Sequence, residues 1–295
     1  MNIPLSFIFF ISSLQEEDPV ISGLIISFGY FLVAIFLLFF AFKFIEGIYV
    51  DFFAKKPLFT HFYLRLKSLN EKEEGVLKRQ FPFYNKLKGR HQKYFQHRVC
   101  RFIDRVDFIG GDGIEINEEK RILTAATGTM LTFGFRNYHI QHLNKIIIYS
   151  DEYYSNLNKT YHKGEFNPGH KAIVFSWKDF KHGYEKEEDN LNLGIHEFVH
   201  AMHISYLGTN KGNDVSANMF VYGLEKIKEL IETNECYENK MKTAGYFRDY
   251  AFTNQFELIA VLVENFIETP SIFKVEFPEI YKEIRQMLNF DFAGY

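Results

Sequence analysis

The sequence predicts an α+β domain that follows a single N-terminal membrane-spanning helix. Residues 20–42 form a run without any charged side chain, and a helix of that length crosses the hydrocarbon core of a bilayer. Two short apolar runs, at 144–149 and 171–177, have the length and composition of buried strands. Helical patterns gather in the second half of the chain. Strands early and helices late are typical of the α+β class.

Composition narrows the class of protein. Hydrophobic residues make up 47% of the 295, which is enough for a sizeable core and excludes a disordered chain. The net charge of −3 argues against a protein built to bind nucleic acid. Cys100 and Cys236 lie far apart without a CxxC spacing. They could pair, but two lone thiols fit a reducing compartment better than a secreted disulfide framework.

The residues beside the apolar run predict its orientation. Acidic residues and no Lys or Arg precede it in the short tail 1–19, whereas Lys43 and several further basic residues follow it. The positive-inside rule therefore places the N-terminus outside and the rest of the chain on the cytoplasmic side of the inner membrane. A cleavable signal peptide fits poorly, since there is no basic start and the apolar run is too long. Residues 3–14 are too short to span and are expected to lie in the membrane interface.

A linking segment, 43–75, separates the anchor from the expected domain at 76–295. Its residues 47–69 mix aromatic and basic side chains. A helix resting on anionic lipid and an ordinary linker explain this composition equally well.

Within the domain the patterns predict the elements in order. Gly110–Gly113 is a turn, since no phosphate-binding pattern follows these glycines. The helix that begins near 190 is expected to be capped by Asp189 or Asn190. The expected helices are 74–101, 120–133, 190–206, 224–234, 255–267 and 278–290, and the expected strands are 144–149 and 171–177.

The helix at 190–206 carries the motif HExxH as His196, Glu197 and His200. Side chains at i and i+4 lie on one face of a helix, so the two imidazoles can bind one Zn²⁺. Glu197 follows the first histidine and can reach a metal-activated water as a general base without being a ligand. The alternative is a surface helix with two histidines, but apolar neighbours such as Ile195, Phe198 and Val199 indicate burial. Buried polar side chains need a partner, and a metal supplies one.

A catalytic zinc ion needs a third protein ligand. The extended motif HExxHxxGxxH is absent, and His203 is closer to His200 than a third histidine should be, so it is expected in the core or beside a ligand. The remaining candidates are glutamates on later segments: Glu225, Glu229, Glu232, Glu235, Glu238, Glu257, Glu264 and Glu268.

Burial decides among these glutamates. Those up to Glu238 are interspersed with lysines, which is typical of a solvated helix face. Glu257 lies among apolar residues, where a carboxylate without a partner is costly, so we predict it as the third ligand. Glu264, seven residues later, shares its face and is expected to orient a ligand histidine.

Three stretches in the same order resemble the Mlc titration factor A family of zinc peptidases: GHKAIVFSW, DNLNLGIHEFVHAM, and the run from Tyr250 to Tyr281. The resemblance covers about two-thirds of the chain. It implies a zincin-like domain of the gluzincin type, with ligands His196, His200 and Glu257, base Glu197, and Tyr250 as the phenol on the oxyanion side. It also implies aminopeptidase activity on peptide-like substrates. The family usually has Asp where this chain has His203, and the segment after that position matches poorly.

The sequence thus predicts a membrane-anchored, zinc-dependent peptidase with one zinc ion. Its expected partners are a peptide or protein substrate, the bilayer through residues 20–42, and a cytoplasmic regulatory protein. The strand at 171–177 is expected to offer an edge to which an extended peptide adds. The alternative is a catalytically weak, zinc-stabilised domain that binds a cytoplasmic regulator at the membrane.

Overall fold

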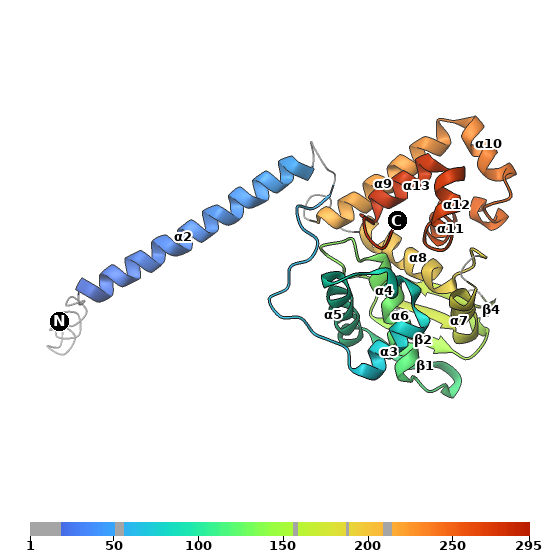
Figure 1. The fold of residues 1–295 in the computed structure, drawn as a ribbon, viewed down its shortest axis with the longest axis horizontal. Coiled ribbons are helices and arrows are strands. Elements are labelled where there is room, and N and C mark those ends of the chain that lie inside the picture. The colour runs from blue at the N-terminus through green and yellow to red at the C-terminus, as the bar shows by residue number, and fades with distance from the viewer. Residues whose placement is uncertain (1–18, 51–55, 156–158, 187–188, 209–213) are drawn as a thin grey trace, which may run out of the picture. The chain divides into compact units, whose positions relative to one another are not determined.

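A computed structural model describes residues 19–50, 56–155, 159–186, 189–208 and 214–295. The chain divides into two compact units, Met1–Leu58 and Phe59–Tyr295 (Figure 1). The expected tail 1–19, with the interfacial stretch 3–14, lies outside the described residues except for Pro19.

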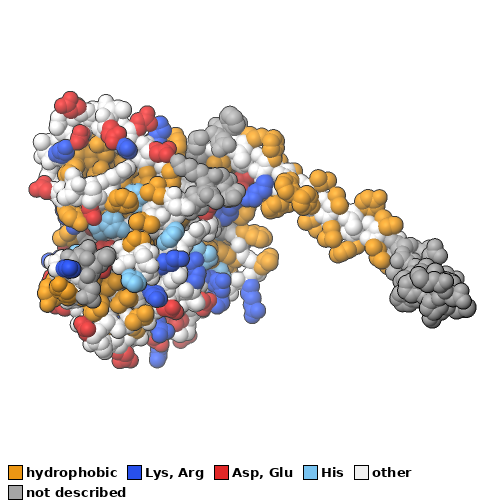
Figure 2. Space-filling model, turned by 180° about the vertical axis from the view of Figure 1, so that it is seen from behind, with side chains coloured by type: hydrophobic (Ala, Val, Ile, Leu, Met, Phe, Trp, Pro, Cys, Tyr) orange, Lys and Arg blue, Asp and Glu red, His pale blue; other side chains and the backbone are white. Residues whose placement is uncertain are grey.

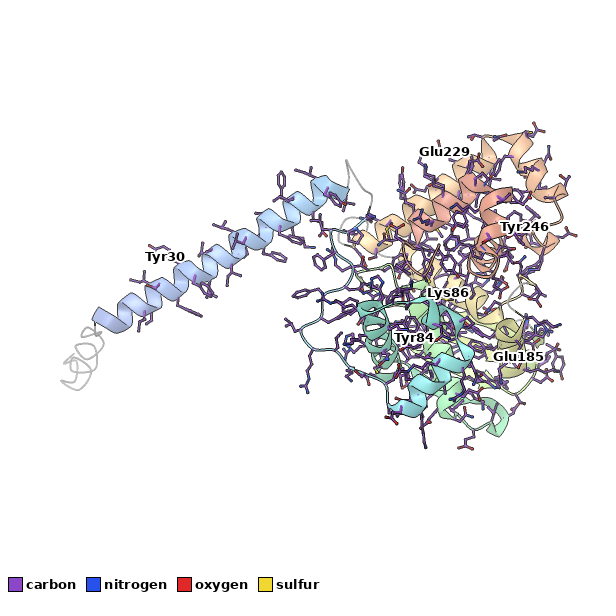
Figure 3. All side chains as sticks on the ribbon, viewed as in Figure 1. Tyr30, Tyr84, Lys86, Glu185, Glu229 and Tyr246 are labelled. Atoms are coloured by element: carbon purple, nitrogen blue, oxygen red, sulfur yellow. The ribbon has the colours of Figure 1, made fainter. Side chains whose placement is uncertain are left out.

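The first unit is the helix α2, Pro19–Ile48. Within its stretch Gly23–Ile48, a window of 18 residues has a mean hydropathy of 2.7 and no buried residue. It is the one helix in the described parts of the chain that is long and apolar enough to cross a membrane. Hydrophobic side chains cover the visible face of this helix (Figure 2), and Tyr30 projects outward from it (Figure 3). The predicted single apolar N-terminal helix is confirmed, and it continues beyond residue 42 through Lys43 and Glu46.

The prediction of one long helix over 74–101 is wrong. Three helices occupy this region because two residues interrupt the helical backbone. Pro82 has no N–H to donate and begins a new helix, and Gly89 takes a left-handed conformation with φ +54°. The helices are α3 (Glu71–Gln80), α4 (Pro82–Lys86) and α5 (Arg90–Arg105).

A four-stranded sheet forms the β part of the domain, in the order β1-β2-β6-β5. Strand β6 (Ala172–Ser176) pairs parallel with β2 (Lys145–Tyr149) and antiparallel with β5 (Gly164–Asn167), while β1 (Asp107–Gly110) pairs parallel with β2. A separate hairpin joins β3 (Tyr153–Ser155) and β4 (Thr160–His162). The apolar runs at 144–149 and 171–177 are strands as predicted, but β6 has neighbours on both sides. The expectation that it offers an edge is therefore wrong, and β1 and β5 are the two edge strands of this sheet.

The remaining elements are helical. The turn predicted at Gly110–Gly113 is present, with the 3₁₀ helix η2 at Gly111–Gly113. The helices that follow η2 along the chain are α6 (Glu118–Leu131), α7 (Trp177–Glu185), α8 (Leu193–Leu207), α9 (Val215–Glu232), α10 (Glu235–Thr243), the 3₁₀ helix η3 (Asp249–Phe252), α11 (Gln255–Glu268), α12 (Pro270–Glu276) and α13 (Pro278–Met287). In Figure 1, α8 lies between the sheet with its helices α3–α7 and the group α9–α13. The α+β class is confirmed.

Two predicted helix starts differ from the observed ones. The helix expected from 190 begins at Leu193 and is capped by Asn192, because Asn190 takes a left-handed backbone conformation with φ +57°. The helix expected over 224–234 begins earlier, where the Asp214 side chain accepts hydrogen bonds from the first free N–H groups of α9.

The core is one cluster centred on α6, whose residues from Ile122 to Leu131 are all buried. α6 packs against α5 on one side and α8 on the other. Gly128 permits this close approach, since a Cβ there would lie 2.7 Å from the Phe198 ring. Tyr84 lies inside the domain (Figure 3), where its hydroxyl donates to Glu74 and accepts from Gln96.

The compact unit begins earlier than the expected domain start at residue 76, since residues 59–69 run along α5. Arg98 on α5 is fully buried and holds this segment through the Thr60 carbonyl and the Tyr63 hydroxyl. The Lys67 backbone N–H donates to His97 Nδ1 at 2.9 Å, which continues the contact toward α3.

Candidate active site

The motif residues lie on α8, which begins where the sequence supplies a cap. The Asn192 side-chain oxygen accepts a hydrogen bond from the Ile195 N–H at 3.0 Å, and its amide donates to the Gly183 carbonyl at 2.9 Å. The helix runs on without interruption through His196 and His200. Their side chains, four residues apart, therefore project from the same face.

The facing residues come from α11. Asn254 caps this helix by accepting hydrogen bonds from the Phe256 and Glu257 N–H groups. Glu257 stands in the first turn, and Glu264 follows two turns later on the same face. Both carboxylates thus face α8, with which α11 makes one of its largest contacts.

Three ligand-type atoms converge between the two helices. Nε2 of His196 lies 3.0 Å from Nε2 of His200 and 2.9 Å from Oε2 of Glu257. The distance from His200 Nε2 to the same carboxylate oxygen is 3.4 Å. Among the described residues, these three form the group of His, Cys, Asp and Glu side chains that could hold a metal ion.

The dimensions of this triangle fit a zinc ion. Ligands at about 2.0–2.1 Å in a tetrahedral arrangement are roughly 3.3 Å apart, close to the three distances observed. With Nδ1–H of His196 donating to Glu264, a neutral His196 directs the lone pair of its Nε2 at the triangle, as a metal ligand does. Glu257 Oε2 is buried and makes no well-aligned hydrogen bond. The donor set is therefore suited to a metal.

Glu264 fixes the orientation of His196 from behind. His196 Nδ1–H donates to Glu264 Oε1 at 2.7 Å, and the other carboxylate oxygen accepts from the Asn192 backbone N–H at 3.0 Å. Arg248 Nη2 also donates to Oε1, at 2.7 Å. These bonds leave His196 Nε2 directed at the triangle. The expected contact between Glu264 and a histidine of the motif is present.

The protonation of the triangle reflects these neighbours. Burial disfavours the charged imidazolium of His196, but the nearby carboxylates of Glu257 and Glu264 outweigh burial and raise its pKa to about 10. Burial alone would raise the pKa of Glu257, yet the two nearby histidines hold that pKa below the usual value.

Glu197 is separate from the triangle and is only 4% exposed. Its Oε2 is buried and has no hydrogen-bond partner within the described residues. Burial raises the pKa of its carboxyl group, against the lowering effect of the two histidines. A carboxylate with a raised pKa is suited to take and return a proton.

Tyr250 stands at the rim of the site in η3, directly before α11. Its ring centre lies 6.2 Å from that of His196, and its side chain is half exposed. Burial and the neighbouring Glu257 raise the pKa of the phenol to about 12, so the hydroxyl remains a proton donor.

Arg248 and Asn192 are the residues that the sequence did not suggest. Arg248 lies two residues before Tyr250. Its hydrogen bond to Glu264 forms only because η3 packs against α11, which the local sequence does not show. Asn192 reads as an ordinary cap, and no local pattern shows that its N–H binds a carboxylate 72 residues away.

His203 does not join the triangle, as expected. It is buried, its ring packs 4.3 Å from that of Phe256, and burial lowers its pKa to about 4. It supports the start of α11 by this packing.

The site opens into a cleft of about 830 Å³. Gly164, at the start of β5, forms part of its wall and closely approaches Glu197. The cleft is lined by residues of β4, β5, α7, α8 and η3 together with Glu264: among others Tyr161, His162, Lys163, His182, His196, Glu197 and Tyr250.

A His–His–Glu cluster beside a buried carboxylate, in an α+β domain with an open cleft, is the arrangement expected of a metallopeptidase. Residues 60–289 match the model of the glucose-regulated metallo-peptidase M90 family. The match covers more than half of the chain, so the chain belongs to this family, in agreement with the resemblance found in the sequence. An uncharacterized protein of Synechocystis sp. is 21% identical over 230 residues, which are 72% of this chain and 82% of that protein.

Proposed function

We propose that the chain is a membrane-anchored, zinc-dependent peptidase whose catalytic domain lies on the cytoplasmic side. The observation that carries this proposal is the convergence of Nε2 of His196, Nε2 of His200 and Oε2 of Glu257. Two imidazoles and one carboxylate are a donor set of catalytic zinc sites, which leave one position open. The apolar helix α2 supports the anchor, and the basic residues after it support the orientation.

The chain's own residues account for the rest of the chemistry. Bound zinc supplies a Lewis acid that activates water. Glu197 accepts the proton of the attacking water and delivers it to the leaving amine. Tyr250 remains protonated at neutral pH and donates a hydrogen bond to the developing oxyanion. Glu264 and Arg248 hold His196 in place while the charge at the site changes.

The peptide substrate extends along the free edge of β5. This strand begins at Gly164 in the wall of the cleft, and only β6 pairs with it among the described strands. An extended peptide can therefore add to the sheet through backbone hydrogen bonds, with its scissile bond near Glu197. Removal of residues from the peptide N-terminus, implied by the family resemblance, is the proposed mode.

A test separates catalysis from a purely structural metal. In the full chain, Glu197→Gln should abolish hydrolysis of a peptide library while the bound zinc, measured by elemental analysis, stays at the wild-type level. Glu276→Gln, an exposed change of the same kind, should leave both unchanged. Wild-type turnover in Glu197→Gln would refute the mechanism. Bound zinc without any peptide hydrolysis in the wild type would instead indicate a zinc-stabilised domain without activity.

A further inference from the structure

Residues 59–69 form a surface segment that has no part in the proposed peptidase chemistry. The segment runs beside α5, and from His61 to Leu64 half-buried and exposed side chains alternate. His61 and Tyr63 face the domain: the His61 ring lies 4.6 Å from that of Phe133, and the Tyr63 hydroxyl accepts from Arg98 at 2.5 Å. Phe62 and Leu64, between and after them, face outward and are 71% and 95% exposed.

The placement of polar and apolar side chains is the reverse of that expected for a surface segment, which normally turns its apolar side chains toward the core. The inward side carries a histidine and a tyrosine, and the outward side carries the apolar residues. Single exposed apolar side chains are normal on a protein surface, but a cluster of them marks an interaction site. Four large exposed ones fall within eight residues here: Phe59, Phe62, Leu64 and Leu66.

The surroundings of this cluster are strongly basic. In the stretches 57–70 and 87–105, Asp104 is the one acidic residue, and it is paired with Lys67. Basic and apolar side chains lie interspersed on the face of the domain seen in Figure 2. The exposed basic residues of the two stretches are Arg65, Lys67, Lys88, Arg90, Lys93, Arg101 and Arg105.

The chain connectivity favours a lipid surface as the partner. α2 ends at Ile48, and Phe59 follows eleven residues later. A fully extended chain of that length spans at most about 40 Å. This tether keeps Phe59 within about 40 Å of the end of the anchor helix. Exposed apolar side chains flanked by Lys and Arg are the combination that binds anionic headgroups.

We propose that residues 59–66 and the exposed basic side of α5 dock the domain on anionic lipid, with Phe62 and Leu64 inserted in the headgroup region. The docking proposal goes beyond the peptidase function. It rests on the proposed membrane anchor and not on peptidase activity. Docking determines which side of the domain faces the membrane, and hence which substrates can reach the cleft.

The test places a reporter at the docking segment of the full chain. Phe62→Trp is reconstituted in nanodiscs with brominated acyl chains, made either of phosphatidylglycerol or of phosphatidylcholine. Trp177 is the single native tryptophan, so the wild type gives the background. Val275→Trp is the matched control, since Val275 is also exposed, at 77%, and lies on α12 on another side of the domain (Figure 1). Phe62→Trp should be quenched in anionic discs and Val275→Trp should not.

A second arm tests the charges. Arg65→Gln with Lys93→Gln should weaken docking by about fivefold per residue and reduce the quenching of Phe62→Trp. Lys274→Gln with Lys282→Gln changes the net charge equally on exposed positions of α12 and α13 and should have no effect. Raising the salt concentration should also weaken docking and reduce the quenching, because salt screens the charges of Arg65 and Lys93.

The proposal fails if Phe62→Trp and Val275→Trp are quenched equally in anionic discs. It fails as well if the quenching of Phe62→Trp is the same in both lipids. Capture of single-stranded DNA by the full chain in neutral discs, lost in Arg65→Gln with Lys93→Gln but with no lipid-dependent quenching, would show a nucleic-acid surface instead. None of these results depends on peptidase activity.

Discussion

Arg98 shows how much one residue contributes to the start of the domain. Its guanidinium is fully buried and donates five hydrogen bonds, to the Tyr63 hydroxyl and to the carbonyls of Thr60, Thr132, Phe133 and Phe135. It also lies over the Tyr138 ring, 4.1 Å from its centre. The charge is thus compensated by carbonyl dipoles and aromatic rings rather than by a carboxylate.

We therefore expect Arg98→Met to destabilise the domain by about 3–5 kcal/mol, because it leaves several buried carbonyls without a donor. Urea denaturation of the full chain in detergent measures the change in the free energy of unfolding. Arg101→Met, an exposed arginine one turn away in the same helix region, should cost less than about 1 kcal/mol. Equal effects of the two substitutions would contradict this role for Arg98.

Glu268, the last residue of α11, connects stability to pH. Both its carboxylate oxygens are buried without a hydrogen-bond partner in the described parts of the chain. Burial, with smaller contributions from Glu264 and Asp189, raises the pKa of Glu268 from 4.5 to about 8. The folded state thus binds a proton between pH 4.5 and 8 that the unfolded chain releases, so the free energy of unfolding falls as the pH rises through this range.

Glu268→Gln should remove this dependence, since the amide is neutral at every pH. Relative to the wild type, the variant should gain up to about 1.4 kcal/mol in free energy of unfolding for each pH unit between 5 and 8. Urea titrations at pH 5, 6.5 and 8 measure the difference. Glu276→Gln, on the exposed side of α12, should show no such trend. A difference that stays constant with pH would refute the buried, protonated state of Glu268.

At the scale of elements, the approach of β5 to α8 controls the position of Glu197, the proposed catalytic base. A Cβ at Gly164 would lie 2.6 Å from the Leu193 Cδ1 and 2.8 Å from the Glu197 Oε1, closer than real Cβ contacts allow. Glycine at the first residue of the edge strand therefore lets Glu197 sit against the sheet. A side chain there would push the carboxylate toward the cleft.

Gly164→Ala should lower kcat by up to about 10²-fold, since a displacement near 1 Å misaligns the base, while the zinc content stays unchanged. Steady-state kinetics on a peptide substrate together with metal analysis measure both. Gly169→Ala is the control in the turn that follows β5, where the nearest atom to a new Cβ is 3.4 Å away. Wild-type kcat in Gly164→Ala would show that Glu197 tolerates the shift.

At the scale of the whole molecule, the unit with the apolar helix α2 and the domain are connected by the chain itself. The proposed orientation leaves the domain in the cytoplasm. Cys236, an exposed free thiol on α10, is a native reporter of the side on which the domain lies.

In intact cells that express the full chain, a membrane-impermeant maleimide should leave Cys236 unlabelled, and permeabilisation should expose it. Ser12→Cys in a Cys236→Ser background places a thiol in the tail, which should be labelled without permeabilisation. Mass spectrometry of the labelled peptides distinguishes Cys236 from the half-buried Cys100. Labelling of Cys236 in intact cells would reverse the proposed orientation.

The elements that the sequence predicted well are those with a strong local signal. The apolar helix, the two buried strands and the helices with sustained periodicity needed only hydrophobic patterning. The small strands β1, β3, β4 and β5 were not predicted, because three or four residues carry too little pattern to distinguish a strand from a loop. The helix at 74–101 was predicted as one because its apolar spacing continues across Pro82 and Gly89.

The sequence by itself determined the long apolar N-terminal helix, the α+β class, the motif on α8 and the candidate residues of the site, since these depend on composition and on spacing along one helix. Only the tertiary structure decided how α11 and η3 face α8. That packing brings Glu257 within 2.9 Å of His196 and adds Arg248 and Asn192 around Glu264. It also assigns a free edge to β5 rather than β6. Contacts between residues more than 50 positions apart arise from burial of the shared core, which no local pattern records.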